Sequence, residues 1–421
     1  MDSFIKLFKL PELRKRFLFT LFVVVIYRLG SHIPIAGIDV ARLQADLFSQ
    51  GGFLDFVNLF SGGGLARFSV FALGILPYIN ASIIMQMLTF VSPSLKDLAM
   101  EGVSGQKQIS QYTRYLTITL ALFQGVVMSL GFRAYVLPEI SLAFFVFYAV
   151  VGLMAGAALV MWLSEVMTER GIGNGASILI FIGIISQLPF YIKNTVTLLE
   201  AGTSPIGVFF MVLILLVMIV AIVYVQEAQR KIPVQYAKRV VGRKMYGGQN
   251  TFIPMRLVQG GVLPIIFASA LLQFPLVIAN FTGIEAIQNF FSQYYRYDGA
   301  LYNGFFCFLI FFFTYFYTAI SFNPKELSDN IKKHGGFIMG VRPGSPTVAY
   351  LEKIVSALTL IGATFLVLVA LLPIVAANFT QVTSFNGLGG TALLIIVGVA
   401  MDFVKQVETY LLSRKYDGFL E

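Results

Sequence analysis

The sequence predicts an all-α protein that crosses a membrane about ten times. Of its 421 residues, 57% are hydrophobic and only 12% are charged, whereas soluble domains average about 25% charged residues. The mean hydropathy is +0.81, and apolar stretches of the roughly 17–25 residues needed to span a bilayer recur along the chain. The basic residues are concentrated in alternate connections between these stretches. Together these observations indicate a polytopic membrane protein.

Ten apolar stretches are candidates for membrane helices, and the first and fifth are marginal in length. In order, they cover residues 17–29, 68–91, 112–132, 140–162, 176–190, 206–225, 257–281, 302–322, 353–376 and 390–407. The N-terminus is basic and then apolar, like a signal peptide, but no small-x-small cleavage site follows it. We therefore interpret residues 17–29 as a retained first helix.

The distribution of Lys and Arg predicts the orientation. The loops on the same side as the N-terminus carry most of the 30 basic residues. Because loops enriched in Lys and Arg face the cytoplasm, both termini are expected on the cytoplasmic side of the cell membrane, as an even number of spans requires. The opposite side carries only Arg28, Arg42, Arg67, Arg133, Lys193 and Arg296.

Two cytoplasmic loops, 226–256 and 323–353, are unusually long and basic. One interpretation is topogenic charge with attraction to anionic lipid. The other is a docking surface for a large acidic partner such as RNA, whose phosphates a basic loop attracts. The sequence VRPG slightly favours the second, because Pro343 and Gly344 predict a tight turn that presents Arg342 at a loop tip.

Several kinds of chemistry lack their signature residues. The predicted spans have no Asp, Glu, Lys or Arg in their middle thirds, which argues against an ion-coupled transporter. There is no GxxxxGK[ST], CxxC or HExxH motif, and the sequence has two histidines and one cysteine, Cys307. We therefore expect no enzyme activity, metal or cofactor. The glycine-rich string TERGIGNGAS at 168–177 predicts a helix end and a tight turn rather than a phosphate loop.

The segment 51–60 is amphipathic but too short to cross lipid. It must lie in the interface or fold back into a cavity lined by protein. The three glycines that follow predict a hinge between this short helix and the second span. The apolar face and the hinge comprise Phe53, Phe56, Val57, Phe60, Gly62, Gly63 and Gly64.

Isoleucines accompany helix breakers within the spans. Ile75 and Ile79 lie on one helix face with Pro77 between them, which is expected to kink the span, and Pro264 precedes Ile266 similarly. For any single isoleucine, ordinary packing against lipid or protein is the simpler interpretation. Amide and hydroxyl side chains in the spans can hydrogen-bond across helix contacts; they include Asn80, Gln124 and Ser269.

Five strings distributed along the chain resemble the SecY family, the central channel subunits of the Sec protein-translocation machinery. They are FSGGGLARFSVFALGILPYINASIIMQML, SGQKQISQYTRY (104–115), MWLSEVMTERGIGNGAS (161–177), YAKR (236–239) and FNPKELSDNIKKHGGFIMGVRPG (322–344). The resemblance implies two pseudo-symmetric inverted halves, about 1–200 and 201–421, around an hourglass pore. It also implies a passive channel for unfolded secretory polypeptides.

The resemblance further implies roles for particular residues. The segment of about 53–65 would be a plug, and the lateral gate would open between spans two and three on one side and seven and eight on the other, with Asn80, Gln124 and Ser269 as polar contacts. Arg243, Lys244 and Arg342 would contact a docked partner. An apolar ring would seal the pore, and Ala176 departs from the bulky aliphatic residue usual in that ring. The matching ring positions are Ile75, Ile79, Ala176, Ile180, Ile266 and Ile395.

The partners implied by the family are the SecA motor ATPase or the ribosome, with its RNA and proteins, together with SecE and SecG, signal sequences, nascent polypeptides and anionic lipid. A signal sequence would part the gate helices, and a membrane segment would leave sideways into lipid. Two other functions compete with the channel. A secondary transporter for small solutes would need a charged site at mid-membrane, and a lipid-binding scaffold would make no use of a hinged plug.

Overall fold

The structure is a computed structural model of the chain. It describes residues 11–50, 58–236, 239–241, 244–246, 250–272, 275, 295, 299–380, 382 and 389–417. Each of the ten predicted spans contains one helix among the described residues, and most of these helices extend beyond the apolar stretch. These helices are α2 (Pro11–Gly30), α5 (Leu76–Val91), α7 (Val103–Gly131), α8 (Leu142–Arg170), α9 (Gly175–Glu200), α10 (Pro205–Glu227), α11 (Leu263–Leu271), α14 (Ala300–Ser321), α16 (Ser345–Thr380) and α17 (Gly389–Asp417).

Seven of the described helices are both long enough and apolar enough to cross a membrane. The remaining described elements connect the spans or lie beside them. They are α3 (Val40–Gln50), α6 (Pro93–Met100), η1 (Arg133–Tyr135), α15 (Pro324–Lys333), β1 (Gln229–Tyr236), β2 (Arg239–Val241), β3 (Lys244–Tyr246), β4 (Asn250–Arg256) and β5 (Gly336–Ile338).

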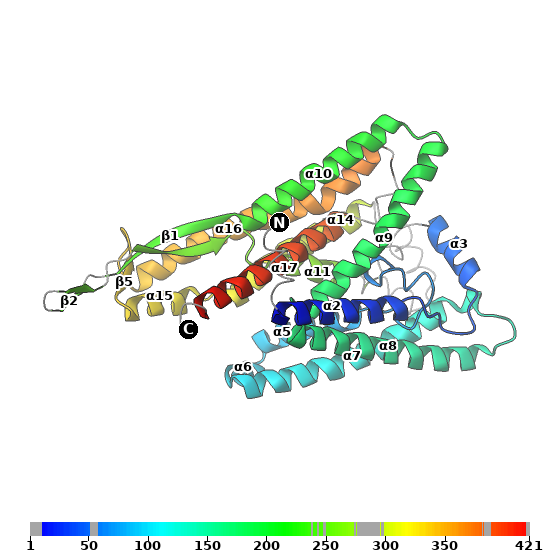
Figure 1. Ribbon diagram of the computed structural model, residues 1–421, viewed down its shortest axis with the longest axis horizontal. Helices are drawn as coiled ribbons and strands as arrows, with labels where there is room; N and C mark the ends of the chain where they lie inside the picture. The colour runs from blue at the N-terminus through cyan, green and yellow to red at the C-terminus, as the bar shows by residue number, and fades with distance from the viewer. Residues whose placement is uncertain are drawn as a thin grey trace.

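The membrane helices form two groups that follow the order of the chain (Figure 1). In the first group, α2, α5, α7, α8 and α9 pack against one another, and in the second α10, α11, α14, α16 and α17 do so. The groups meet principally in two places, where α5 lies against α11 and where α9 lies against α17. Four helices therefore form the seam between the groups.

The starts of two helices differ from the sequence prediction. The second span was expected to be helical from residue 68, but residues 61–75 form turns and α5 begins at Leu76. Pro77 was expected to kink this span, and it lies instead in the first helical turn. Pro264 has the same place in α11. Proline suits this position because the N–H that it lacks has no partner within the helix there.

The turns before α5 and α11 repeat one backbone geometry. Gly74 and Gly261 both have φ of 56°. The next residues, Ile75 and Val262, have φ/ψ of −94°/−2° and −89°/−9° and act as N-caps. Each is followed by Leu-Pro, so the tetrapeptides GILP and GVLP start corresponding helices in the two groups.

The other two seam helices also begin alike. GASILIFIG starts α9 at Gly175, and GTALLIIVG lies at the start of α17, where Gly390 corresponds to Gly175. A Cβ at Gly175 would overlap the Ser164 carbonyl oxygen of α8, and one at Gly390 would overlap the Val369 carbonyl oxygen of α16. In both groups a glycine thus lets a seam helix start in close contact with a neighbouring backbone.

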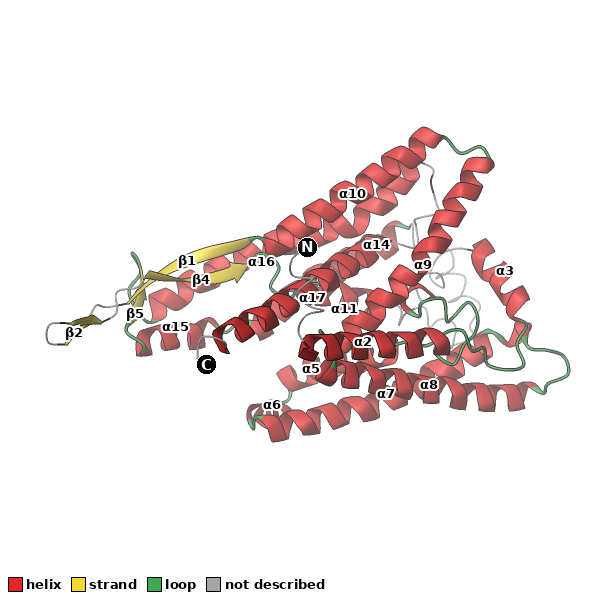
Figure 2. Cartoon of the chain, viewed as in Figure 1, coloured by secondary structure: helices red, strands yellow, loops and turns green. Residues whose placement is uncertain are grey.

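The two long basic loops fold together into a small sheet (Figure 2). No strand was predicted in either loop. The strand order of the sheet is β4-β1-β5, and β1 pairs antiparallel with both neighbours, with Val234 opposite Thr251 and Ile338. One face packs on α15 and α16 through a hydrophobic cluster. That cluster contains Ile232, Val234, Met255, Ile331, Ile338, Leu351, Ile354, Val355 and Leu358.

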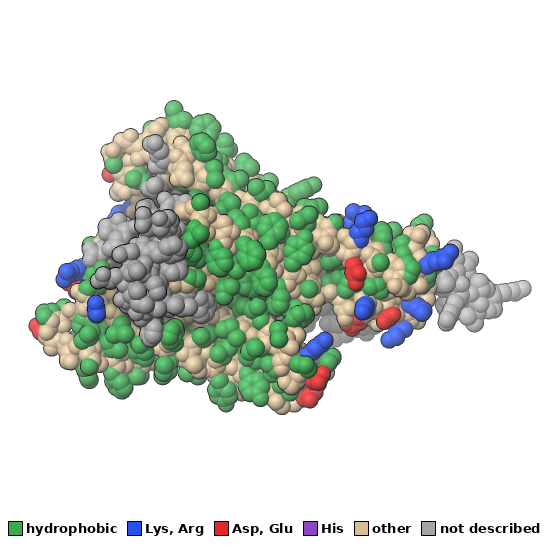
Figure 3. Space-filling view, turned by 180° about the vertical axis from the view of Figure 1, so that it is seen from behind, with side chains coloured by type: hydrophobic (Ala, Val, Ile, Leu, Met, Phe, Trp, Pro, Cys, Tyr) green, Lys and Arg blue, Asp and Glu red, His purple; other side chains and the backbone are tan. Residues whose placement is uncertain are grey.

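The surface agrees with a membrane location. Hydrophobic side chains cover the middle of the molecule, and charged side chains gather toward its two ends (Figure 3). On α10, the side chains of Phe209, Leu216 and Val220 are 65%, 56% and 69% exposed. Apolar exposure on this scale is expected where lipid is the solvent.

The close contact at Gly175 predicts a stability effect. Gly175→Ala should lower the free energy of unfolding by roughly 1–3 kcal/mol, because the new methyl group meets the α8 backbone rather than a flexible side chain. The measurement is the thermal unfolding midpoint in detergent. Gly304→Ala in α14 is the matched control, since a Cβ there meets nothing within 4 Å. Equal midpoints for the two variants would contradict the predicted contact.

Candidate functional site

Five isoleucine positions picked out in the sequence lie on the four seam helices. Ile75 caps α5, Ile79 lies in its first turn, and Ile266 has the same place in α11. Ile180 lies in α9 and Ile395 in α17. None of the five is more than 6% exposed, and all belong to one hydrophobic cluster. The structure therefore brings these side chains into the core that joins the two groups.

Ala176 is the sixth predicted position. It lies in the first turn of α9, is partly buried, and packs against the same cluster. A methyl group fills much less volume than an isoleucine side chain. Whether the cluster is looser at this point stays a prediction.

Sequence reasoning missed Val262. It occupies in GVLP the place that Ile75 occupies in GILP, and it is 7% exposed within the same cluster. Both residues accept the first helical hydrogen bond, from Ile266 N at 3.2 Å and from Ile79 N at 3.1 Å. The repetition of GILP as GVLP is the sequence signal that could have identified Val262.

The glycine segment is a compact turn rather than the start of a long helix. Residues 58–66 are all buried. Gly62 and Gly63 have φ of 64° and 87°, values that glycine adopts without a Cβ penalty. These backbone angles close turns, so the second span begins as a helix only at Leu76, and the hinge at the glycines stays a prediction. Phe60 is 1% exposed, while Phe53, Phe56 and Val57 lie outside the described residues.

Asn58 organises this turn. Its side-chain Oδ1 accepts from Ala66 N at 2.9 Å, and its backbone carbonyl accepts from Gly63 N at 2.9 Å. The Ser61 hydroxyl adds a bond from Leu65 N at 3.0 Å. The segment thus satisfies much of its own backbone, as buried irregular chain requires.

The contact between α5 and α11 corresponds to the predicted lateral gate. Ser269 donates to the Ile266 carbonyl of its own helix at 2.8 Å, and Gln124 is partly buried in α7. Asn80 is 3% exposed, and among the described residues its Oδ1 has no hydrogen-bond partner. The polar contacts predicted across this seam stay a prediction.

An aromatic pair joins α5 to α14 and was not predicted. The rings of Phe90, near the end of α5, and Phe316, in α14, have centroids 5.6 Å apart at an interplanar angle of 74°. This T-shaped arrangement places the edge of one ring toward the face of the other. Phenylalanine is frequent throughout the spans, so the sequence carried no signal for this pair.

The loop tip around Arg342 has the predicted form. Arg342 is exposed, its carbonyl accepts from the Thr347 hydroxyl at 2.9 Å, and Gly344 has φ of 106°. The Ser328 hydroxyl donates to the Gly344 carbonyl at 3.3 Å. The turn prediction is confirmed. Arg243 lies outside the described residues, and only the backbone of Lys244 is described, in β3.

The string TERGIGNGAS forms the predicted helix end and turn. Helix α8 ends at Arg170, and Asn174 caps α9 by accepting from Ser177 N at 3.3 Å. Arg16 Nη1 donates to the Gly171 carbonyl at 3.4 Å and to the Tyr410 hydroxyl at 3.3 Å. Arg16 of α2 thus contacts both this turn and α17.

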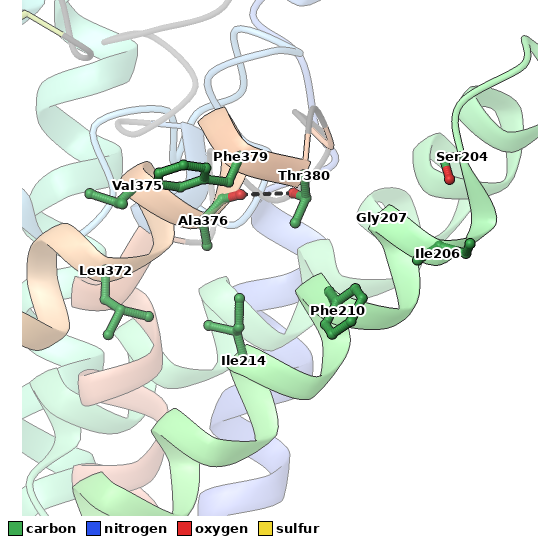
Figure 4. Close-up of a pocket in the computed structure, with 10 residues that line it drawn as sticks. All are labelled: Ser204, Ile206, Gly207, Phe210, Ile214, Leu372, Val375, Ala376, Phe379 and Thr380. Atoms are coloured by element: carbon green, nitrogen blue, oxygen red, sulfur yellow. Dashed lines mark hydrogen bonds between the residues drawn. The ribbon is translucent and has the colours of Figure 1, made fainter.

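A groove of about 670 Å³ lies between α10 and α16 (Figure 4). The only hydrogen bond drawn there runs from the Thr380 hydroxyl to the Ala376 carbonyl, at 2.8 Å. Its lining offers no charged group for chemistry, and no group of metal-binding side chains occurs among the described residues. The lining residues are Ser204, Ile206, Gly207, Phe210, Ile214, Leu372, Val375, Ala376, Phe379 and Thr380.

Comparison with solved structures supports the ten-helix fold with two pseudo-symmetric halves. The chain aligns over 95% of its length with a structure described as a protein conducting channel, covering 93% of that chain with a TM-score of 0.66 at 19% identity. It aligns equally far with Sec61 in the canine ribosome-channel complex, at a TM-score of 0.62 and 18% identity.

Sequence comparisons give closer relatives. The SecY family model matches residues 69–404. The protein translocase subunit SecY of Thermus thermophilus is 46% identical over 434 residues, covering all of this chain and 98% of the relative. The corresponding subunit of Thermotoga maritima is 42% identical over 430 residues with the same coverage. On these matches, the chain belongs to the SecY family.

Proposed function

We propose that this protein is a passive channel for unfolded polypeptides in the cytoplasmic membrane, with no enzymatic activity of its own. The observation that carries the proposal is the seam. Five isoleucines on α5, α9, α11 and α17, the helices through which the two groups meet, are buried in one hydrophobic cluster. In this proposal, a path between the groups passes these side chains.

The isoleucines suit a seal that opens and closes. An apolar constriction excludes water from a closed pore without forming bonds that a passing chain would have to break. Ile75, Ile79, Ala176, Ile180, Ile266 and Ile395 form this ring in the proposal. The proposed plug covers about residues 53–65, and its described part, from residue 58, supports a place beside the ring because Gly183 of α9 approaches the backbone of residues 59–62.

The gate of the proposed channel lies between α5 and α7 on one side and α11 and α14 on the other. Parting these helices would open the seam toward lipid, and a hydrophobic segment could then leave the channel sideways. Asn80, Gln124 and Ser269 would face the opening. The Phe90–Phe316 contact supports this proposal because it links α5 on one side of the gate to α14 on the other.

Energy for transport must come from a partner, since the sequence has no nucleotide-binding motif. We propose that the small sheet and its loops, with Arg243, Lys244 and Arg342, dock a motor such as SecA or a ribosome. SecE and SecG are the proposed membrane partners. Both termini lie in the cytoplasm in this proposal, which is supported by the excess of Lys and Arg in the loops on that side.

Removing the plug should open the idle channel to ions. Deleting residues 54–62 is expected to raise the conductance of purified protein in planar bilayers severalfold, because the buried segment 58–62 would leave the seam. The undeleted chain at the same protein-to-lipid ratio is the control. Unchanged conductance would contradict the plug assignment.

Loosening the aromatic pair should ease gate opening. Phe316→Ala removes a T-shaped contact of about 0.5–1.5 kcal/mol, so transport of a substrate with a weakened signal sequence should rise up to about tenfold in reconstituted vesicles. Phe308→Ala is the matched control on the same helix, since Phe308 is 62% exposed. If both variants behave alike, the pair does not hold the gate.

Docking should depend on the charge at the loop tip. Arg342→Glu is expected to reduce motor-driven translocation at least tenfold while leaving insertion of the channel into the membrane intact. Lys96→Glu, at an exposed basic residue on α6 outside the two basic loops, is the control for charge alone. Normal ATP-driven transport by the Arg342 variant would exclude this residue from the docking surface.

A further inference from the structure

We propose that Arg28 is a latch that holds segment 58–64 against α9 and so keeps the outer side of the closed channel sealed. The proposal rests on the channel function given above. It assigns a positioning role to a residue that the sequence distinguished only as one of the few basic groups on the outer side.

The latch is a contact among three elements. Arg28 lies in the last turn of α2. Its Nη1 donates to the Gly62 carbonyl at 2.8 Å and to the Ser186 hydroxyl of α9 at 2.9 Å. Ser186 in turn donates its proton to the Gly183 carbonyl at 2.6 Å, so its oxygen lone pairs are free to accept from Arg28. One guanidinium nitrogen thus connects α2, the glycine segment and α9.

The backbone around the latch is shaped for this contact. A Cβ at Gly62 would lie 3.1 Å from Gly183 Cα, and a Cβ at Gly183 would lie 3.1 Å from the Phe60 carbonyl oxygen. Two glycines therefore let the segment and α9 approach closely enough for Arg28 to reach both. Gly62 also has a φ of 64°, so both this backbone angle and the close approach to α9 favour glycine at position 62.

The position of Arg28 itself is fixed. The Ser31 hydroxyl donates to the Arg28 carbonyl at 2.8 Å, and His32 Nδ1 lies 2.8 Å from the same oxygen. These contacts hold the end of α2, so the guanidinium is presented from a rigid support. The side chain of Arg28 is partly buried, where a charge-assisted hydrogen bond is stronger than at an exposed site.

The segment can leave α9 without unfolding. Its internal bonds, from Gly63 N and Ala66 N to Asn58 and from Leu65 N to Ser61, join residues within 58–66. Arg28 instead joins the segment to α2 through the Gly62 carbonyl, and α2 to α9 through the Ser186 hydroxyl. Opening therefore requires the latch to break while the turn stays intact, which makes Arg28 a control point for the outer seal.

The test measures single-channel conductance of the full chain in planar bilayers without substrate. Arg28→Met removes the donors and should raise the fraction of time open about tenfold or more. Ser186→Ala should give a smaller rise, and Arg28→Lys should restore part of the closure because it keeps a charged donor. Arg133→Met, which removes an exposed charge on the same predicted side, should leave the conductance unchanged.

The double variant separates a latch from a general loss of stability. Because Arg28 and Ser186 share one contact, combining Arg28→Met with Ser186→Ala should add little to Arg28→Met alone. If Arg28→Met does not fold, an unchanged conductance for Ser186→Ala overturns the latch.

Failure of the latch and failure of the channel give different results. If Arg28→Met stays closed while deletion of 54–62 conducts, the latch is wrong and the channel stands. If neither the deletion nor any other variant conducts, and no polypeptide is transported, the proposed function itself is wrong.

Discussion

The structure depends on one constraint, that backbone polar groups buried at membrane depth must find partners inside the protein. Helices satisfy this locally, but residues 61–75 form turns rather than a regular helix. They succeed because Asn58 and Ser61 bond the turn internally and because the chain pairs with the segment after α2, from Ile35 N to the Phe68 carbonyl at 2.9 Å and from Val70 N to the Ile33 carbonyl at 3.0 Å. A Cβ at Gly156 of α8 would overlap the Val70 carbonyl oxygen, so a neighbouring helix covers this irregular stretch directly.

The number and order of the membrane helices were predictable because span length and hydropathy are local properties. The first residues of α5 and α11 were not, since a hydropathy profile does not distinguish an apolar turn from an apolar helix. The positive φ of Gly74 and Gly261 ends the turn, and the proline that follows begins the helix. Comparing GILP with GVLP would have located both starts.

The small sheet could not be predicted from the sequence for a different reason. Strand β1 and strand β5 come from two loops about a hundred residues apart, and each loop alone has only part of the sheet. The alternation in QRKIPVQY, which buries Ile232 and Val234, was too short to outweigh the basic character of the loop. In the candidate site, the turn at Arg342 was predictable from four adjacent residues. The Phe90–Phe316 pair and the Arg28 contact were not, because they depend on elements brought together by the fold.

The places where the seam helices begin have an electrostatic consequence. Ile79 and Ile266 lie in the first turns of α5 and α11, and Ile180 and Ile395 lie within the first two turns of α9 and α17. The N-terminal end of a helix carries about half a positive charge. Four such ends therefore lie near the buried isoleucines, which creates a positive potential around these side chains. In the proposed channel, that potential would oppose the entry of protons and metal cations, in addition to the exclusion of water.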